Sequence, residues 1–248
     1  MKTIKVITAC FRGRVAHGGF GLGDRDELQN SEDALKMIRT VLENEKKIDA
    51  GSQMDTLIVN NDVGYDPGRK YLDSIEGNKT KNGFFKVLHR ENIGRAFGGY
   101  NEAFNKYKDE YDYWIFSEDD LYYCKDGYAK NYIDILNSNQ NCAFVATLGI
   151  GRADHETKHA HGGQGLTHRD YMEETVPMEY TEDDGTNRQA YKKAGCLAYH
   201  LDKNESDAYN TRLHCVHGEV PFTYSLIKLG YNIHTAQNPE EWYKIYGQ

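Results

Sequence analysis

The sequence predicts an α/β fold in which helices flank a mostly parallel central sheet. Short apolar runs alternate with stretches of helical periodicity, which is typical of such folds. The 248 residues are enough for one sizeable core and too few for two full domains. Hydrophobic residues make up 39% and charged residues 27%, as in soluble globular proteins. We therefore expect a single domain over residues 1–248.

The first half of the chain predicts three strands and two helices. Ile4–Phe11 is apolar and leads into a glycine-rich basic stretch, which favours a strand followed by a loop. Between Ser31 and Ile48 apolar residues fall on one helical face, with Asn30 or Ser31 available as N-cap. Aromatic residues recur every three or four positions from Phe97 to Tyr107, which predicts a helix packed on the sheet. Runs rich in apolar and β-branched residues predict strands at Asp55–Asp62 and Phe84–Leu88.

The second half is less regular. Residues 150–190 are rich in glycine, histidine and acids and show little periodicity, so we expect a functional or mobile loop there. Pro221 is expected to open a last helix that Gly230 closes. The other expected elements are strands at Tyr113–Phe116, Cys142–Leu148, Cys196–Leu201 and Asn232–Ala236, and a helix at about Asp126–Leu136.

Charge and cysteine content limit the class of protein. A net charge of −8 argues against a nucleic-acid partner but leaves room for a small phosphorylated ligand. Five cysteines without a CxxC pair favour a reduced, cytoplasmic setting. No run approaches the roughly 20 apolar residues of a membrane span. The first apolar run leads directly into Arg12 and Arg14, so we expect a strand rather than a signal peptide. The nineteen tyrosines suit stacking on sugars, or they reflect biased composition alone.

The main chemical signal is the acidic tripeptide Glu118-Asp119-Asp120, which follows the predicted strand Tyr113–Phe116. Open α/β sheets bind ligands at the carboxyl ends of their strands. Crowded carboxylates repel one another unless they share a cation, and oxygen ligands suit Mn²⁺ or Mg²⁺. For three acids alone, a solvated loop is the alternative interpretation.

Two upstream segments add a family resemblance. An Asn92-x-Gly94 turn precedes a helix rich in small residues, and Asn61-Asp62 ends the second predicted strand. Together with the acidic tripeptide, in this order and spacing, they resemble the first half of GT-A glycosyltransferases, with family 2 as the nearest pattern. Glu118-Asp119-Asp120 also resembles the Glu-Asp-Asp variant of the DxD motif in N-acetylglucosaminyltransferase I. The resemblance covers residues 1–150 well and the rest loosely.

The resemblance implies a GT-A (Rossmann-like) fold and a metal-dependent glycosyltransferase. Such an enzyme moves a sugar from a nucleoside-diphosphate donor to a glycan or other hydroxyl acceptor, here with inversion. Residues 1–120 would bind the nucleotide sugar and residues 121–248 the acceptor, with Asp120 holding Mn²⁺ or Mg²⁺. The nucleotide base would lie near Thr8 and Asn61, although Asn61 stands where the family usually has an acid, so the nature of the base stays open. The full set of implied donor-binding residues is Thr8, Arg12, Asn61, Asn92, Gly94, Arg95, Glu118 and Asp119. Arg12, Arg14 or Arg95 could bind the donor phosphates, because guanidinium groups match phosphate oxygens. Each can also be an ordinary surface charge.

An inverting transferase needs a base for the acceptor hydroxyl. Glu219 precedes the helix that Pro221 opens and so resembles the acid-then-helix element that carries this base in GT-A enzymes. It can also be an ordinary acid at a helix start. Asp183 and Asp184, in an acid-rich loop, are the rival candidates.

Three histidines and one glycine-rich loop allow further interpretations. The resemblance implies that His234, in the expected last strand, completes the metal shell. His159-x-His161 has a metal-binding spacing, but we expect a mobile loop there rather than an ordered site. The glycine-rich loop 18–25 is similar to the phosphate loop of sugar-phosphate nucleotidyltransferases, but its spacing is off. That activity is the alternative enzymatic function, and a non-catalytic carbohydrate-binding module is the third hypothesis.

Overall fold

The structure is a computed structural model that describes residues 1–12, 30–92, 95–152, 158–175 and 219–247. A seven-stranded sheet runs through it in the order β10-β6-β9-β4-β1-β2-β3. Its strands are β1 Thr3–Ala9, β2 Met54–Asp62, β3 Phe85–Glu91, β4 Tyr113–Glu118, β6 Cys142–Ala146, β9 Gly165–His168 and β10 Asn232–Thr235. Strand β9 is antiparallel to both of its neighbours, and the other paired strands are parallel. The prediction of a mostly parallel α/β sheet is confirmed.

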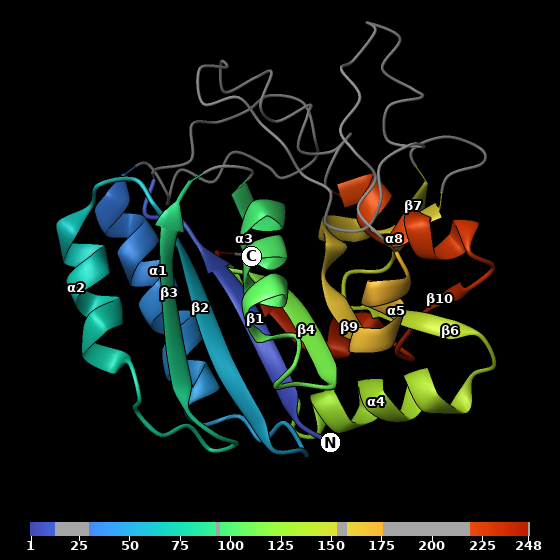
Figure 1. Cartoon of the computed structure of the whole chain (residues 1–248). Coiled ribbons are helices and arrows are strands. Elements are labelled where there is room, and N and C mark those ends of the chain that lie inside the picture. Colours follow the sequence, from blue (N-terminus) through green and yellow to red (C-terminus); the bar gives the residue numbers. More distant parts are fainter. Residues whose placement is uncertain (13–29, 93–94, 153–157, 176–218, 248) are drawn as a thin grey trace, which may run out of the picture.

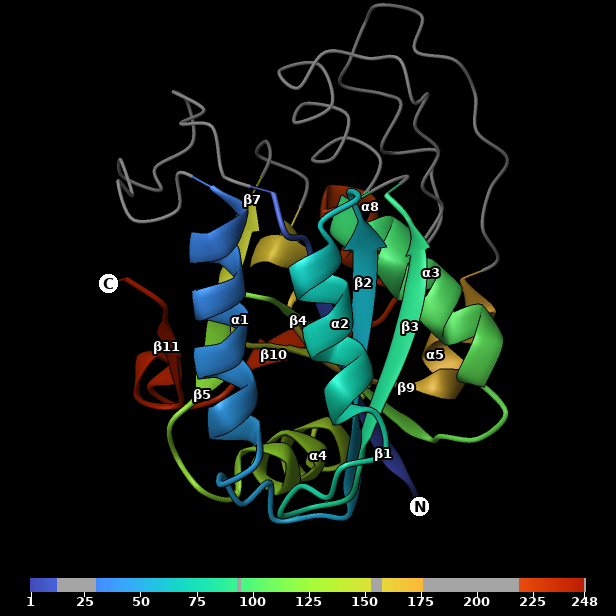
Figure 2. The same cartoon turned by 90° about the vertical axis from the view of Figure 1, so that its left-hand side faces the viewer.

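Helices cover both faces of this sheet (Figures 1 and 2). They are α1 Ser31–Glu45, α2 Asp66–Ile75, α3 Arg95–Tyr107, α4 Tyr128–Ser138, α5 Arg169–Glu174 and α8 Val220–Lys228, with short 3-10 turns η2 His161–Gly163 and η4 Pro239–Glu241. Two small antiparallel pairs complete the architecture, β5 Leu121–Tyr123 with β11 Tyr243–Ile245, and β7 Ile150–Arg152 with β8 Lys158–Ala160. None of the described helices is both long and apolar enough to cross a bilayer.

Alternation along the strands decides which helix packs on which face. On β1, Ile4 and Val6 pack with α3 and α8, whereas Ile7 and Ala9 pack with α1 and α2. The neighbouring strands follow the same rule, and Ile115 of β4 packs with α4 on the second face. The sheet is therefore the middle of three layers, and Figure 2 shows α1 and α2 on the side of β1–β3 opposite α3.

The order β3-β2-β1-β4 is the order of a doubly wound nucleotide-binding sheet. From β1 the chain moves outward to β2 and β3, then returns to place β4 on the other side of β1. In such sheets the crevice beyond the carboxyl ends of the two central strands is the usual ligand site. Here those ends are Ala9 and Glu118, so the fold places the acidic tripeptide at this switch point.

Expected elements were found at most positions, with bounds that differ by a few residues. Helix α1 begins as expected, because the Asn30 side chain accepts hydrogen bonds from the backbone N–H groups of Glu32 and Asp33. Helix α2 was missed, since most of its ten residues are polar or exposed and only Gly68, Leu72 and Ile75 are buried. The strand expected at Cys196–Leu201 lies outside the described residues.

Part of the stretch at about 150–190, for which we expected a functional or mobile loop, forms regular secondary structure. Residues 150–152 and 158–175 form β7, β8, η2, β9 and α5. Strand β9 fills the gap between β4 and β6, where Leu166 is opposite both Ile115 and Val145. These elements have three to six residues, too few to produce a visible periodicity in the sequence.

Candidate functional site

The acidic turn is tied to the two central strands. Glu118 ends β4 and is opposite Thr8 in the parallel pairing with β1. Asp119 and Asp120 follow in a turn and are only 7% and 6% exposed. The Asp119 Oδ2 atom accepts a hydrogen bond of 3.0 Å from the backbone N–H of Cys10, just beyond β1. The Asp120 carbonyl accepts one of 2.8 Å from the N–H of Tyr246, which follows β11. The turn is therefore hydrogen-bonded to the residue that follows β1 and to the residue that follows β11.

Tyr100 of α3 is fully buried next to these acids. Burial raises the pKa of its phenol well above the usual value, and the negative charges of Glu118, Asp119 and Asp120 raise it further. The Tyr100 ring centroid is 4.8 Å from that of Phe116, two residues before Glu118, so the ring lies beside the end of β4. The switch point therefore concentrates negative charge, and a cation or a cation-bound ligand would relieve it.

Thr8 and Asn61 lie beneath helix α3. Both side chains are buried, at the ends of β1 and β2. A Cβ added to Gly99 of α3 would stand 2.8 Å from the Thr8 Cγ2 atom and 3.5 Å from the Asn61 Oδ1 atom. The helix approaches the sheet this closely because glycine has no side chain there. The structure thus places both predicted base-contacting residues near each other, but under the helix rather than on an open surface.

Arg90 is a residue that the sequence analysis did not single out. It lies on β3, and its Nη1 donates a hydrogen bond of 2.5 Å to Asn61 Oδ1 while its Nε donates one of 2.7 Å to Glu102 of α3. This guanidinium joins β2, β3 and α3 at the carboxyl end of the sheet. In the sequence, Arg90 could have been noticed only as an arginine close to the end of a predicted strand. Its partners Asn61 and Glu102 are too distant in the sequence to be predicted.

The other predicted donor-binding residues are only partly described. The Asn92 side chain donates a long contact of 3.9 Å to the Cys10 sulfur, which places it beside the end of β1. Arg12 is exposed just beyond that strand. Gly94, Arg14, Asp183, Asp184 and the side chain of Arg95 lie outside the described residues.

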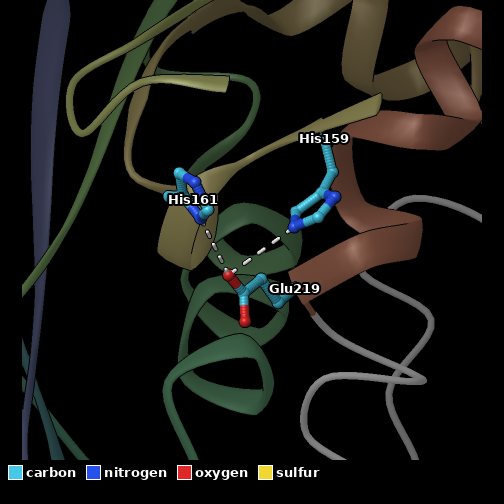
Figure 3. A group of neighbouring side chains, drawn as sticks. All are labelled: His159, His161 and Glu219. Atoms are coloured by element: carbon cyan, nitrogen blue, oxygen red, sulfur yellow. Dashed lines mark ion pairs between the residues drawn. The ribbon is translucent and has the colours of Figure 1, made fainter. Parts of the chain in front are cut away.

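A second polar group consists of two histidines and a glutamate (Figure 3). His159 of β8, His161 of η2 and Glu219, the N-cap residue of α8, point toward one another. The Glu219 Oε1 atom is 3.9 Å from His159 Nε2 and 4.0 Å from His161 Nδ1. It also accepts a hydrogen bond of 2.9 Å from the backbone N–H of Gly162. We expected a mobile loop around His159-x-His161. In the structure this segment belongs to β8 and η2, and His159 is buried.

Aromatic residues close to both groups in the sequence pack together on the α3 face of the sheet. Phe222, one turn into α8, contacts the rings of Phe97 and Tyr100 on α3 and of Phe116 on β4, with ring centroids 5.2–6.1 Å apart. Gly165, directly after the η2 segment, pairs with Phe116 of β4, two residues before Glu118. Helix α8, which begins after Glu219, and strand β4, which ends at Glu118, are therefore both packed against α3.

His234 lies elsewhere. It belongs to β10, an edge strand that β6 and β9 separate from β4. Strands spaced by about 4.8 Å put roughly 14 Å between β10 and β4. Within the described part of the chain, the one group of three His, Cys, Asp or Glu side chains close enough to share an ion is His159, His161 and Glu219. The structure does not bring Asp120 and His234 together.

Comparison with known proteins gives little further information. No protein-family model matches the sequence, and no curated protein matches it at a significant level. Among solved structures, S. aureus TarS 1-349 aligns with a TM-score of 0.47 at 11% identity, covering 99% of this chain and 60% of that one. A CMP:2-keto-3-deoxy-manno-octonic acid synthetase complexed with CTP aligns with a TM-score of 0.45 at 12% identity, covering 95% of this chain and 89% of that one. At these values neither likeness assigns a fold family or an activity to this chain.

Proposed function

We propose that this chain is a GT-A glycosyltransferase that transfers a sugar from a nucleoside-diphosphate donor to a hydroxyl acceptor. The observation that carries the proposal is the position of Glu118-Asp119-Asp120 at the switch point of the sheet, with Glu219 at the start of helix α8, whose Phe222 contacts α3 and β4. A donor would lie over the carboxyl ends of β1 and β4. An acceptor would approach from the side of η2 and α8.

The chemistry of the turn fits a hard divalent cation. Mg²⁺ and similar ions usually take one or two carboxylates from the protein and the remaining oxygens from substrate phosphates. Asp120, and beside it Glu118, would supply those carboxylates, while Asp119 accepts the Cys10 N–H and ties the turn to the end of β1. When bound, Mn²⁺ or Mg²⁺ would neutralise charge that develops on the departing diphosphate.

Glu219 is the proposed base. Its carboxylate is fixed by the Gly162 N–H and flanked by two histidines, so it keeps one orientation at the start of α8. It would take the proton of the acceptor hydroxyl as that oxygen forms its bond to the anomeric carbon. The bond from that carbon to the diphosphate breaks at the same time, and the nucleoside diphosphate leaves with the electron pair. Attack from the face opposite the leaving group inverts the configuration.

The proposal is tested with a panel of nucleotide sugars and Mn²⁺, with and without simple glycan acceptors. We expect one donor to release its nucleoside diphosphate, slowly to water and faster to an acceptor. Glu219→Gln should still bind that donor and should lose transfer by about 100-fold or more, the usual contribution of a general base.

Other results would contradict the proposal in distinct ways. Pyrophosphate release from a nucleoside triphosphate and a sugar phosphate would show a nucleotidyltransferase. Glycan binding without metal and without turnover would show a non-catalytic module. If Glu219→Gln transfers sugar at the original rate, the base lies elsewhere, and Asp183 and Asp184 are the next residues to test.

A further inference from the structure

We propose that His159, His161 and Glu219 form a binding site for Zn²⁺, separate from the acidic turn. The three side chains come from β8, η2 and the start of α8 and converge on one point (Figure 3). Each offers one ligand atom, and these atoms all lie within 4.8 Å of one another. Zinc is often bound by two imidazoles and one carboxylate, with the fourth position left to water or substrate.

The distances are close to those of a bound ion. Zinc–nitrogen bonds of about 2.0–2.1 Å put tetrahedral ligands about 3.4 Å apart. The Glu219 Oε1 atom is 3.9 Å from His159 Nε2 and 4.0 Å from His161 Nδ1. These two pairs would shorten by about half an ångström around an ion, and the ligand atoms of the two histidines lie within 4.8 Å of each other.

The backbone around the ligands is fixed by its own hydrogen bonds. The N–H of Ala160, between the two histidines, donates 2.9 Å to the hydroxyl of Thr223 on α8. The N–H of His161 donates 3.1 Å to the carbonyl of Gly149. The first bond connects the His-x-His segment to helix α8, which begins after Glu219, and the second connects it to the residue before β7, so folding brings the three ligands together before any ion binds. The Gly162 N–H holds the carboxylate, which is the role of an outer partner to a metal ligand.

The ring of His161 is positioned by a glycine. A Cβ on Gly151 of β7 would come within 2.4 Å of the His161 Cε1 atom, so the ring lies directly against the backbone of the hairpin. The side chain is nevertheless 52% exposed, whereas that of His159 is 8% exposed. One ligand is therefore buried and one faces solvent, which gives an ion a path to the site.

Ligand chemistry separates this site from the acidic turn. Imidazole nitrogens favour Zn²⁺ and its transition-metal neighbours, whereas all-oxygen ligand sets favour Mg²⁺ and Mn²⁺. The two ends of the proposed catalytic region would thus select different ions. One consequence rests on the proposed function: a carboxylate that ligates Zn²⁺ does not accept a proton, so Zn²⁺ should inhibit transfer.

The test measures Zn²⁺ binding to the whole purified chain by calorimetry, with Co²⁺ absorption as a probe of tetrahedral nitrogen and oxygen ligands. The informative variants are His161→Gln, whose side chain is half exposed, and Glu219→Gln, which keeps an acceptor for the Gly162 N–H. Each should weaken Zn²⁺ binding by more than about 100-fold, since loss of even an outer partner costs about 10–100-fold. His89→Gln, on β3 at the other edge of the sheet, is the matched control and should bind Zn²⁺ like the unmodified chain.

The outcomes separate this inference from the proposed function. Absence of Zn²⁺ binding to the unmodified chain, or equal binding in both informative variants, would overturn the site. Inhibition is measured as a fraction of each variant's own rate at a fixed excess of Mn²⁺, and His161→Gln should need far more Zn²⁺ than the unmodified chain. Binding at this site without inhibition would support the zinc site and contradict Glu219 as the base.

Discussion

Two buried acids of the same turn have different tasks. Asp119 accepts the backbone N–H of Cys10 and so joins the end of β4 to the end of β1. Asp120 is held through its backbone carbonyl by the N–H of Tyr246, and its side chain is the metal ligand proposed above. The sequence alone predicted where this turn lies and assigned Asp120 to the metal and Asp119 to the donor, but it did not predict the bond from Cys10 to Asp119, because a hydrogen bond across 109 residues has no local signal.

Asp119→Ala should therefore reduce stability more than Asp119→Asn does. Alanine leaves the partly buried Cys10 N–H without its charged acceptor, and such a bond contributes about 1.5–3 kcal/mol to the free energy of unfolding. The amide oxygen of asparagine can still accept that N–H, so most of the loss should be recovered. Urea denaturation of the two variants checks this. Equal losses would mean that the Cys10 contact contributes nothing measurable.

At the scale of elements, the packing of α3 on β1 and β2 positions the donor side of the candidate site. Gly99 allows this close approach, and Arg90 holds α3 through Glu102 while it holds β2 through Asn61. Aromatic periodicity predicted the helix correctly. The glycine's role depends on a contact with Thr8, which is 91 residues earlier in the chain.

Gly99→Ala should destabilise the protein despite the higher helix propensity of alanine. The propensity gain is about 1 kcal/mol, whereas forcing a methyl group into a well-packed contact costs typically about 1–3 kcal/mol. The new Cβ would stand 2.8 Å from Thr8 Cγ2, a group that serine lacks. Gly99→Ala should therefore cost less in a Thr8→Ser background, where only the 3.3 Å approach to Val59 Cγ1 remains tight. A double-mutant cycle of unfolding free energies measures this coupling, and additive effects would contradict the packing argument.

The elements that the sequence did not predict are short or depend on distant partners. Strand β9 has four residues and exists because its backbone completes the hydrogen bonding between β4 and β6. The spacing of His159 and His161 was visible, since residues two apart share a face of an extended chain. Their proximity to Glu219 was not, because it requires α8 to pack against β8.

At the scale of the whole molecule, the core contains many buried polar rings. Tyr100, Tyr123, Tyr128 and Tyr132 are all fully buried. Burial raises the pKa of each phenol, to about 12 for Tyr132. The buried ammonium of Lys5, paired with Glu45, has its pKa lowered by burial and so acts in the opposite direction. Composition revealed the nineteen tyrosines but not which of them are inside.

The protein should lose stability as pH rises above about 10, the ordinary pKa of tyrosine. Because the folded-state pKa values of these phenols are raised, the stability that the buried neutral phenols contribute is complete below about pH 10, the unfolded-state pKa. It is lost as pH rises toward the folded-state pKa, because unfolding then releases protons. The loss of stability from the four buried tyrosines should outweigh the opposite effect of Lys5. Urea midpoints between about pH 8 and pH 11, with tyrosinate absorbance recorded in parallel, check this. A constant midpoint, or tyrosinate formation well before unfolding, would contradict it.

The central claim is that the acidic turn binds a nucleoside-diphosphate donor together with a divalent cation. The most direct measurement is calorimetric binding of a panel of nucleoside diphosphates, with and without Mn²⁺, to the unmodified chain and to Asp120→Asn. Asp134→Asn, an exposed acid on α4, serves as the charge-matched control. We predict that one nucleotide binds only when Mn²⁺ is present, that Asp120→Asn abolishes this binding, and that Asp134→Asn leaves it unchanged. Metal-dependent binding that survives in Asp120→Asn, or no nucleotide binding at all, would contradict the account.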